Sequence, residues 1–118
     1  KVLGDLHANG KFTLGENIAA QGGHQVSYYA FMKTRDGKST EKIDGFTPQQ
    51  RFFLAYANLW AGNIRDAEIT RLTKIDPHAL GKWRVDGALP QVESWYKAFN
   101  ITETDSLFIP KEKRVSIW

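Results

Sequence analysis

The segment from Phe52 to Ala61 constrains the fold more than any other part of the sequence, because Asn58 is its one plainly polar residue. Thr47-Pro48-Gln49-Gln50 precedes it with the residues of a helix start: Thr as the N-cap, Pro at the first helical position and Gln where its side chain closes a capping box. A helix that is apolar on nearly all sides must be buried on nearly all sides. A chain of 118 residues can hardly surround it. We therefore expect a fragment whose missing remainder covers part of this helix, in keeping with a start at Lys1 that has no initiator Met.

The residues before this segment predict a long first helix from Thr13 to about Arg35. Thr13 and Glu16 have the spacing of a capping box, and residues 1–12 are expected to form a loop or short strand. Gly22-Gly23 interrupts the helix at a cost of ~1 kcal/mol for each glycine, which implies close packing or a kink there.

The residues after this segment predict two more helices. A third helix is expected from Arg65-Asp66 to just before Pro77, because a residue that precedes proline disfavours helical geometry. A fourth begins at Pro90, where apolar side chains follow at helical spacing (Val92, Trp95, Tyr96 and Phe99). Trp83-Arg84-Val85 is expected to be a short extended piece within the intervening loop. The predicted fold class is thus mainly α, with four helices and irregular loops in a single domain spanning residues 1–118.

Composition and charge narrow the possible functions. The chain has no Cys, so disulfides and thiolate metal sites are excluded, and a metal would need carboxylates together with His7, His24 or His78. The formal net charge of +3 is spread along the chain, so we expect no nucleic-acid partner. No apolar run approaches the ~20 residues of a membrane span, and no contact with a membrane can be inferred from the sequence.

Four side chains are candidates for chemistry: Glu16, His24, His78 and Arg84. Glu16 and His24 lie two turns apart on roughly one helix face, but a lone helical histidine is more often a surface or partner-satisfied residue than a metal ligand. His78 and Arg84 are six residues apart in one loop and could point into one cleft. Such a pair suits the binding of an oxyanion or carboxylate, because a guanidinium contacts two oxygens at once. The alternative is a capped turn beside a surface arginine.

Several separated motifs occur along the chain in a consistent order and spacing. They are Gly15-Glu16-Asn17-Ile18-Ala19 with Gly22-Gly23, Phe52-Phe53-Leu54 with Trp60, Asp76-Pro77-His78 with Trp83-Arg84-Val85 and Gly87, and Lys113-Arg114-Val115 ahead of Trp118. Together they resemble the C-terminal part of the neprilysin and endothelin-converting-enzyme family of zinc metallopeptidases. The resemblance covers essentially the whole chain, and a series of motifs in register is far more specific than any one of them.

The resemblance implies the C-terminal part of a thermolysin-like catalytic domain with one zinc ion. In that family two histidines of an H-E-x-x-H helix and a glutamate of a later E-x-x-x-D helix hold the zinc. Glu16 matches the glutamate ligand, His78 the histidine that stabilises the transition state, and Arg84 the arginine that holds a substrate carbonyl oxygen. The chain contains no His-Glu pair, so two ligands and the general base would come from upstream residues. We expect this chain alone to be inactive.

The chain departs from the family at two positions on the same helix. Ala20 stands where family members have an aspartate that orients a zinc-binding histidine, a contact whose loss typically costs ~10- to 100-fold in metal affinity or activity. His24 stands one turn later, where an apolar residue is expected, and could point into the same region. Either the parent protein is a weakened or inactive homologue, or the residue was changed by design.

Three hypotheses therefore follow from the sequence. The first is part of a bacterial zinc endopeptidase or oligopeptidase that acts on peptides, placed outside the cytoplasm by the resemblance alone. The second is a catalytically impaired homologue that keeps a peptide-binding cleft, as Ala20 and His24 suggest. The third is an autonomous helical interaction module, which would be a monomer with a cooperative thermal transition. Against the third, the apolar segment from Phe52 to Trp60 predicts association of the isolated chain.

Overall fold

The computed structural model describes residues 1–117 and is mainly helical, as predicted. In this part of the chain the elements follow in the order α1 (Gly10–Lys33), α2 (Pro48–Leu59), α3 (Asp66–Ile75), α4 (Gly81–Asp86), η1 (Leu89–Gln91), α5 (Glu93–Phe99) and η2 (Lys111–Lys113), where η denotes a 3-10 helix. Residues 1–117 contain no β-strand, only isolated bridges in two tight turns at 3–6 and 43–46. The motif residue Trp118 lies outside the described residues.

Helix α1 begins at Gly10, three residues before the predicted start, because Asn9 is its N-cap. The Asn9 side chain accepts a hydrogen bond from the Phe12 N–H at 3.1 Å, which satisfies one of the free donors of the first turn. Thr13 already lies inside the helix and its N–H donates to the Asn9 carbonyl. The predicted capping box of Thr13 and Glu16 is therefore wrong, and the Glu16 carboxylate is free for other partners.

Helices α2 and α3 form close to where the sequence predicts them. Thr47 and Gln50 make both bonds of the capping box, Thr47 N–H to Gln50 Oε1 at 3.0 Å and Gln50 N–H to Thr47 Oγ1 at 3.2 Å. Helix α3 ends at Ile75, two residues before Pro77, as the proline requires.

The prediction of an extended piece at Trp83-Arg84-Val85 is wrong, because these residues form the centre of α4. The N–H groups of Trp83 and Arg84 donate to the Leu80 carbonyl at 2.8 and 3.1 Å and so close a first helical turn. A helix of six residues is too short to show a periodic pattern in sequence, which is why the fold has one α-helix more than expected. The expected helix start at Pro90 is also displaced, since Leu89–Gln91 is a 3-10 turn and α5 begins at Glu93.

Gly81, the first residue of α4, lies against the end of α2. A Cβ atom at this position would be 2.9 Å from the Trp60 carbonyl oxygen and 3.2 Å from the Trp60 Cβ. The first of these distances is shorter than a side chain tolerates, so α4 can approach α2 this closely only with glycine at position 81.

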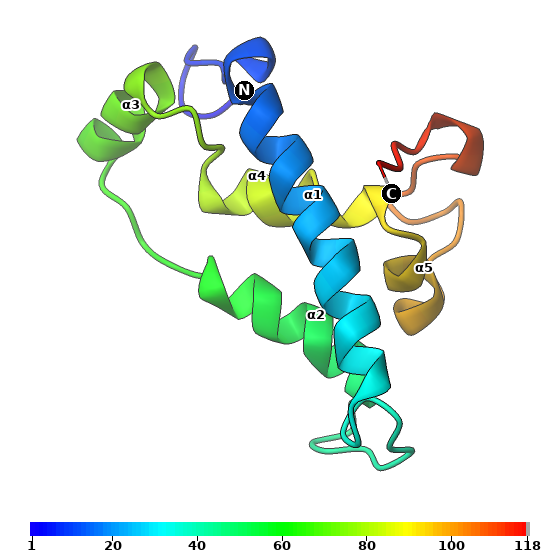
Figure 1. The fold of residues 1–118 in the computed structure, drawn as a ribbon. Helices are drawn as coiled ribbons and strands as arrows, with labels where there is room; N and C mark the ends of the chain where they lie inside the picture. Colours follow the sequence, from blue (N-terminus) through cyan, green and yellow to red (C-terminus); the bar gives the residue numbers. More distant parts are fainter. Residues whose placement is uncertain (118) are drawn as a thin grey trace.

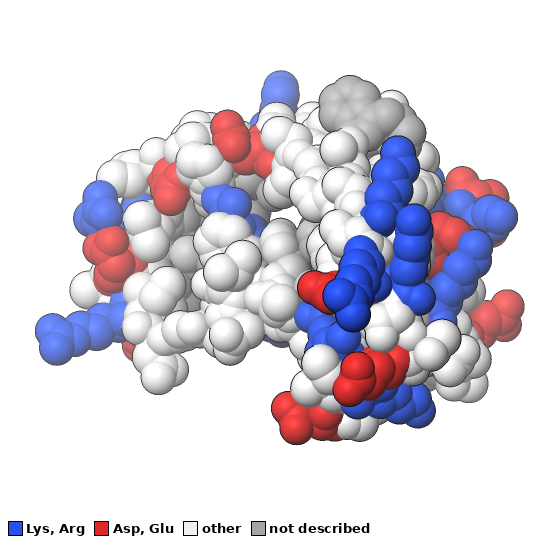
Figure 2. Space-filling model, turned by 60° about the horizontal axis from the view of Figure 1, so that its bottom comes forward, with Lys and Arg blue, Asp and Glu red and all other residues white. Residues whose placement is uncertain are grey.

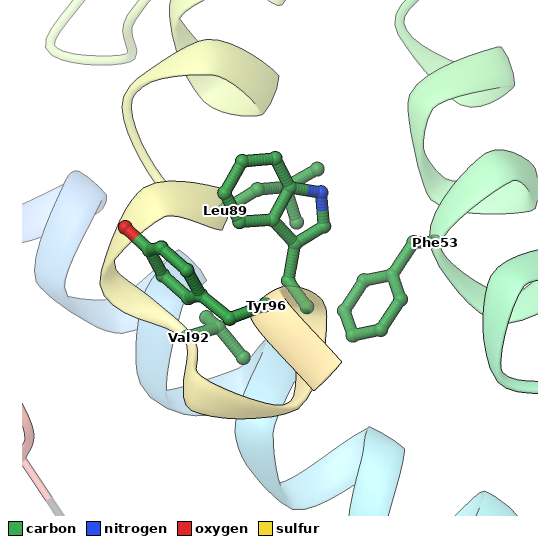
Figure 3. Packing of buried hydrophobic residues seen from close by; sticks show 5 residues of the cluster. Phe53, Leu89, Val92 and Tyr96 are labelled. Carbon is green, nitrogen blue, oxygen red and sulfur yellow. The ribbon is translucent and has the colours of Figure 1, made fainter. Parts of the chain in front are cut away.

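The hydrophobic core lies between α2 and the η1–α5 region (Figure 3). Its buried members are Phe53, Leu89, Val92, Trp95 and Tyr96. Phe53 is 1% exposed, and truncation of a phenylalanine buried to this degree typically costs ~3 to 5 kcal/mol. The predicted apolar face of the last helix thus forms most of the core, and α2 contributes one side chain to it.

Helix α1 runs diagonally across the molecule, and α2 diverges from it to leave one flank of both helices open (Figure 1). On α2, Leu54 and Leu59 are 39% and 76% exposed, as expected for a chain too short to surround this helix. Charged side chains gather on one side of the face shown in Figure 2, where Lys and Arg are interspersed with Asp and Glu. Among the described residues, no helix combines the length and apolar character needed to cross a membrane.

Candidate functional site

Glu16 and His78 come from different parts of the chain and meet at the surface of α1. Glu16 lies in the second turn of α1, and His78 follows α3 in the connection to α4. Their Oε2 and Nε2 atoms are 3.0 Å apart, a hydrogen-bonding distance, and the side chains are 47% and 43% exposed. The structure thus brings together the predicted metal ligand and the predicted catalytic histidine.

Asp76 orients the His78 ring. Its Oδ1 atom lies 2.7 Å from His78 Nδ1 and also accepts a hydrogen bond from the His78 N–H at 2.9 Å. These bonds and the nearby charges of His78 and Arg84 hold the pKa of the Asp76 carboxyl below its ordinary value. Asp76 accepts from the Nδ1–H, and Nε2 is the atom presented to Glu16. Because a carboxylate only accepts, the contact with Glu16 is a hydrogen bond when Nε2 also carries a proton.

Asp76 is not among the predicted site residues, although its position in the sequence indicates the contact with His78. An aspartate side chain commonly accepts a hydrogen bond from the backbone N–H two residues later, which forms an Asx-turn. Asp76 makes this bond with the N–H of His78. A side chain in that turn also lies within reach of the histidine ring.

Arg84 is fixed on α4 by three contacts. Its Nε donates to the Ala79 carbonyl at 3.0 Å, and its guanidinium carbon lies 4.3 Å from the centre of the Trp60 ring. The Tyr56 hydroxyl donates to the Arg84 carbonyl at 3.2 Å. The remaining guanidinium N–H groups have no partner within the described residues, so they are available to a carbonyl or carboxylate.

Two large cavities meet at Ala20 and Arg84. One, of about 500 Å³, is also lined by Glu16, Gln21 and Trp83. The other, of about 870 Å³, is an open groove between α1 and α2 with a mostly aromatic and aliphatic lining (Phe31, Ile43, Phe52, Tyr56, Leu59 and Trp60). Glu16 and Arg84 therefore share a cavity, as a common site requires.

His78 does not line either of these two cavities. It borders a smaller one of about 160 Å³, together with Asp76 and residues of the N-terminal segment. The expectation that His78 and Arg84 point into one cleft is therefore not supported by the cavities, and the link between them runs through Glu16.

His24 is turned toward α2 and packs among aromatic rings. Its ring centre is 4.3 Å from that of Tyr56, 5.2 Å from Phe52 and 5.5 Å from Phe53, and the residue is 6% exposed. Its Nε2 atom has no hydrogen-bond partner among the described residues. Burial lowers the pKa of His24 to about 4, so the ring is neutral near pH 7. His24 is thus an aromatic packing residue, although it borders the same groove as Ala20.

The chemistry of Glu16 fits a zinc site of which residues 1–117 supply one part. The Glu16 carboxylate is half-exposed, and carboxylate oxygens are common zinc ligands. No group of three or more His, Cys, Asp or Glu side chains among the described residues is arranged to hold a metal. A complete site therefore needs ligands from outside them.

Known proteins resemble this chain over most of its length. The sequence model described as "Peptidase family M13" matches residues 1–115. The chain is 38% identical over 104 residues to neprilysin-21 of Caenorhabditis elegans, which covers 83% of the chain and 14% of that protein. It is 34% identical over 121 residues to membrane metallo-endopeptidase-like 1 of Mus musculus, which covers 100% of the chain and 16% of that protein.

The fold agrees with solved structures of the zinc metalloprotease Zmp1 of Mycobacterium tuberculosis. The open state superimposes with a TM-score of 0.88 and an inhibitor complex with 0.89, each at 38% identity over 95% of this chain and 17% of Zmp1. The predicted fold class, a mainly helical part of a thermolysin-like zinc peptidase domain, is therefore confirmed. The chain spans about one sixth of the length of these relatives. On the sequence match, the relatives and the fold, the chain belongs to peptidase family M13.

Proposed function

We propose that this chain is the C-terminal part of the catalytic domain of a zinc-dependent endopeptidase or oligopeptidase of bacterial type. It would hydrolyse peptide bonds outside the cytoplasm, in the periplasm, the cell envelope or the medium. Family membership supports the reaction class, and Zmp1 is named as a zinc metalloprotease. The observation that carries the proposal is the 3.0 Å contact between Glu16 and His78, which unites two predicted site residues from distant parts of the chain.

Glu16 is the proposed zinc ligand. Its place on the exposed face of α1 leaves the carboxylate accessible to a second helix packed beside it, and the cavity of about 500 Å³ extends from it to Arg84. The two histidine ligands and the general base belong to an H-E-x-x-H helix encoded upstream of residue 1. When bound, zinc would activate a water molecule for attack on the peptide carbonyl.

His78 and Arg84 are the proposed catalytic residues. His78 Nε2 would donate a hydrogen bond to the oxyanion that forms on the attacked carbonyl, which requires a proton on Nε2, while the Nδ1–H of the same ring donates to Asp76. Arg84 would hold a carbonyl oxygen of the substrate, with its guanidinium kept in position by the Trp60 ring and the Ala79 carbonyl. Because the upstream helix is required, the chain alone is expected to be inactive.

The test uses the full-length protein that carries this chain. Zinc content is measured by mass spectrometry and hydrolysis with an internally quenched peptide, before and after chelation. Glu16→Gln should lose most of the zinc, because a neutral amide is a far weaker ligand than a carboxylate. Glu103→Gln, a matched change at an exposed loop position, should keep it. Full zinc content in Glu16→Gln would exclude Glu16 as a ligand.

A second candidate function rests on Ala20. The Ala20 methyl group lines both large cavities at the position where the family has an aspartate. The neighbouring Gln21 side chain donates to the Val115 carbonyl, so it cannot replace that aspartate. On this alternative the parent protein binds peptides without cleaving them. Peptide binding by the full-length protein without turnover at saturating zinc would favour it, and ordinary turnover would exclude it.

A further inference from the structure

The C-terminal tail of the described chain, residues 114–117, is held between two glutamines. The Gln21 side-chain amide on α1 donates to the Val115 carbonyl. The Val115 N–H donates to Oε1 of Gln91 on η1 at 2.8 Å. The backbone of one tail residue, Val115, therefore connects the Glu16-bearing helix to the η1–α5 region.

The tail is also anchored one residue earlier. The Arg114 guanidinium carbon lies 3.4 Å from the centre of the Tyr96 ring, and Nη1 contacts Glu93 Oε2 at 2.7 Å. Arg114 Nε donates to the Ile109 carbonyl at 2.8 Å, and its side chain is 11% exposed. Since Tyr96 belongs to the core, the position of Val115 is set by the core.

Gln21 is well suited to transmit this position to α1. It is 6% exposed, so its amide is withdrawn from water and an unmet donor there would destabilise the fold. Gln21, Gln91 and Val115 line the same cavity of about 500 Å³ as Glu16 and Arg84. The contact thus lies in one wall of the space into which the proposed zinc ligand projects.

We propose that Gln21 and Gln91 are positioning residues, which bind the backbone C=O and N–H of Val115 as a clamp. Through these bonds the C-terminal tail would keep the Glu16 face of α1 at the distance from α4 and η1 that the zinc site requires. This inference rests on the proposed function, since it assigns the clamp to the geometry of the zinc site. The two glutamines act with opposite polarity: Gln21 must donate and Gln91 must accept.

That polarity allows hydrogen bonding to be separated from charge. Gln21→Glu removes the donor, whereas Gln21→Lys keeps one. At the other end the order reverses, because Gln91→Lys removes the acceptor and Gln91→Glu keeps it. The two Glu variants carry the same charge, but we expect the tail to be released in Gln21→Glu and bound in Gln91→Glu. For the two Lys variants we expect the tail to be bound in Gln21→Lys and released in Gln91→Lys. Gln91 is less buried than Gln21, so its variants also keep the test informative if a charge at position 21 prevents folding.

The experiment uses the full-length protein and two readouts, zinc affinity by competition with a chromophoric chelator and amide hydrogen exchange by mass spectrometry. In Gln21→Glu and Gln91→Lys we expect faster exchange in residues 111–117 and 14–21, and a zinc Kd raised about tenfold, the lower end of the effect of losing a residue that orients a metal ligand. Gln21→Lys and Gln91→Glu should keep the slow exchange of the unmodified protein in both segments.

Three results would overturn the clamp. One is faster exchange in the tail with unchanged exchange in residues 14–21 and unchanged zinc Kd, which would make the contact a local anchor only. Another is slow tail exchange in all four variants. The third is an effect that follows the sign of the charge and ignores which variant retains the hydrogen bond. If the unmodified protein binds no zinc, the proposed function fails, and exchange in residues 14–21 alone decides the clamp.

Discussion

The Nε2 atom of His78 lies 3.0 Å from Oε2 of Glu16, so the connection between α3 and α4 is folded onto the exposed face of α1. Asp76 fixes the opposite nitrogen of the same ring. Three side chains therefore form one hydrogen-bonded series, Asp76 to His78 to Glu16, at the edge of the proposed zinc site. Asp76 therefore sets the direction of the ring, and Nε2 contacts Glu16 at the site.

Asp76→Asn should lower kcat of the full-length peptidase at least about tenfold with a smaller change in KM, because the ring loses the partner that fixes its tautomer. Hydrogen bonds from His78 hold the Asp76 pKa below its ordinary value, so Asp76 stays ionised at every pH above that value. The ionisation of Asp76 itself should therefore add no pH dependence to the loss between pH 6 and 8. Steady-state kinetics across this range check it. Asp105→Asn, at an exposed turn, is the control, and equal rates for the two variants would contradict the role of Asp76.

Ala20→Asp should raise zinc affinity, or kcat at limiting zinc, by ~10- to 100-fold, because it restores a carboxylate in the cavity that Glu16 lines. Ala19→Asp places the same charge one residue away on an exposed position of α1 and should leave zinc affinity near its starting value. Chelator competition measures both. An equal gain in the two variants would mean that charge alone, and no oriented hydrogen bond, accounts for the effect.

Arg84→Lys should raise KM for peptide substrates about tenfold, equivalent to about 1.4 kcal/mol, with less change in kcat. A lysine keeps the charge but loses the Nε bond to Ala79 and the planar stack on Trp60. Arg71→Lys on α3 makes the same exchange in an exposed pair with Glu68 and should not alter KM. Unchanged KM in Arg84→Lys would remove Arg84 from substrate binding.

His24→Phe should abolish the loss of folding stability that His24 causes as the pH falls. The folded-state pKa of His24 is about 4, below the ordinary 6.5, so protonation favours the unfolded chain. The stability is complete above pH 6.5 and falls as the pH drops toward 4, by up to about 3 kcal/mol. Thermal unfolding of the protein from pH 7.5 to 4.5 measures the slope, with exposed His7→Phe as the control. A slope that survives in His24→Phe would assign it to another group.

The isolated chain should self-associate through the open groove between α1 and α2. Leu59 is 76% exposed at this groove, so Leu59→Glu should shift the chain toward monomer in light scattering. Leu107→Glu, outside the groove, should not. A monomeric parent chain with cooperative unfolding would instead support an autonomous module.

The helices that sequence alone predicts well are those with strong local signals. Thr47 and Gln50 fix the start of α2 by contacts within four residues, and Pro77 limits α3. The start of α1 differs from the prediction because Asn9, four residues before Thr13, is the N-cap that forms. Helix α4 was missed because its formation depends on packing against Trp60, which no local pattern reports.

The sequence proposes members for the site but does not predict their contacts. Glu16, His78 and Arg84 were identified by their place among distant motifs, and the structure brings Glu16 near each of the other two. The aromatic surroundings of His24 could not be foreseen, since they depend on how α1 packs against α2. The link from Gln21 to Val115 joins residues 94 positions apart, beyond the reach of any periodic signal.

The position of Arg84, the proposed substrate-binding arginine, depends on Gly81, a residue that has no side chain. Arg84 lies on α4 and its stacking partner Trp60 at the end of α2, and the two helices approach where Gly81 meets the Trp60 carbonyl. Alanine at position 81 would force α4 outward by several tenths of an ångström and carry the guanidinium off its aromatic support. Homologues that differ at position 81 should therefore differ in peptide affinity even when every residue that touches the peptide is the same, and a survey of charged and aromatic positions alone would overlook the cause.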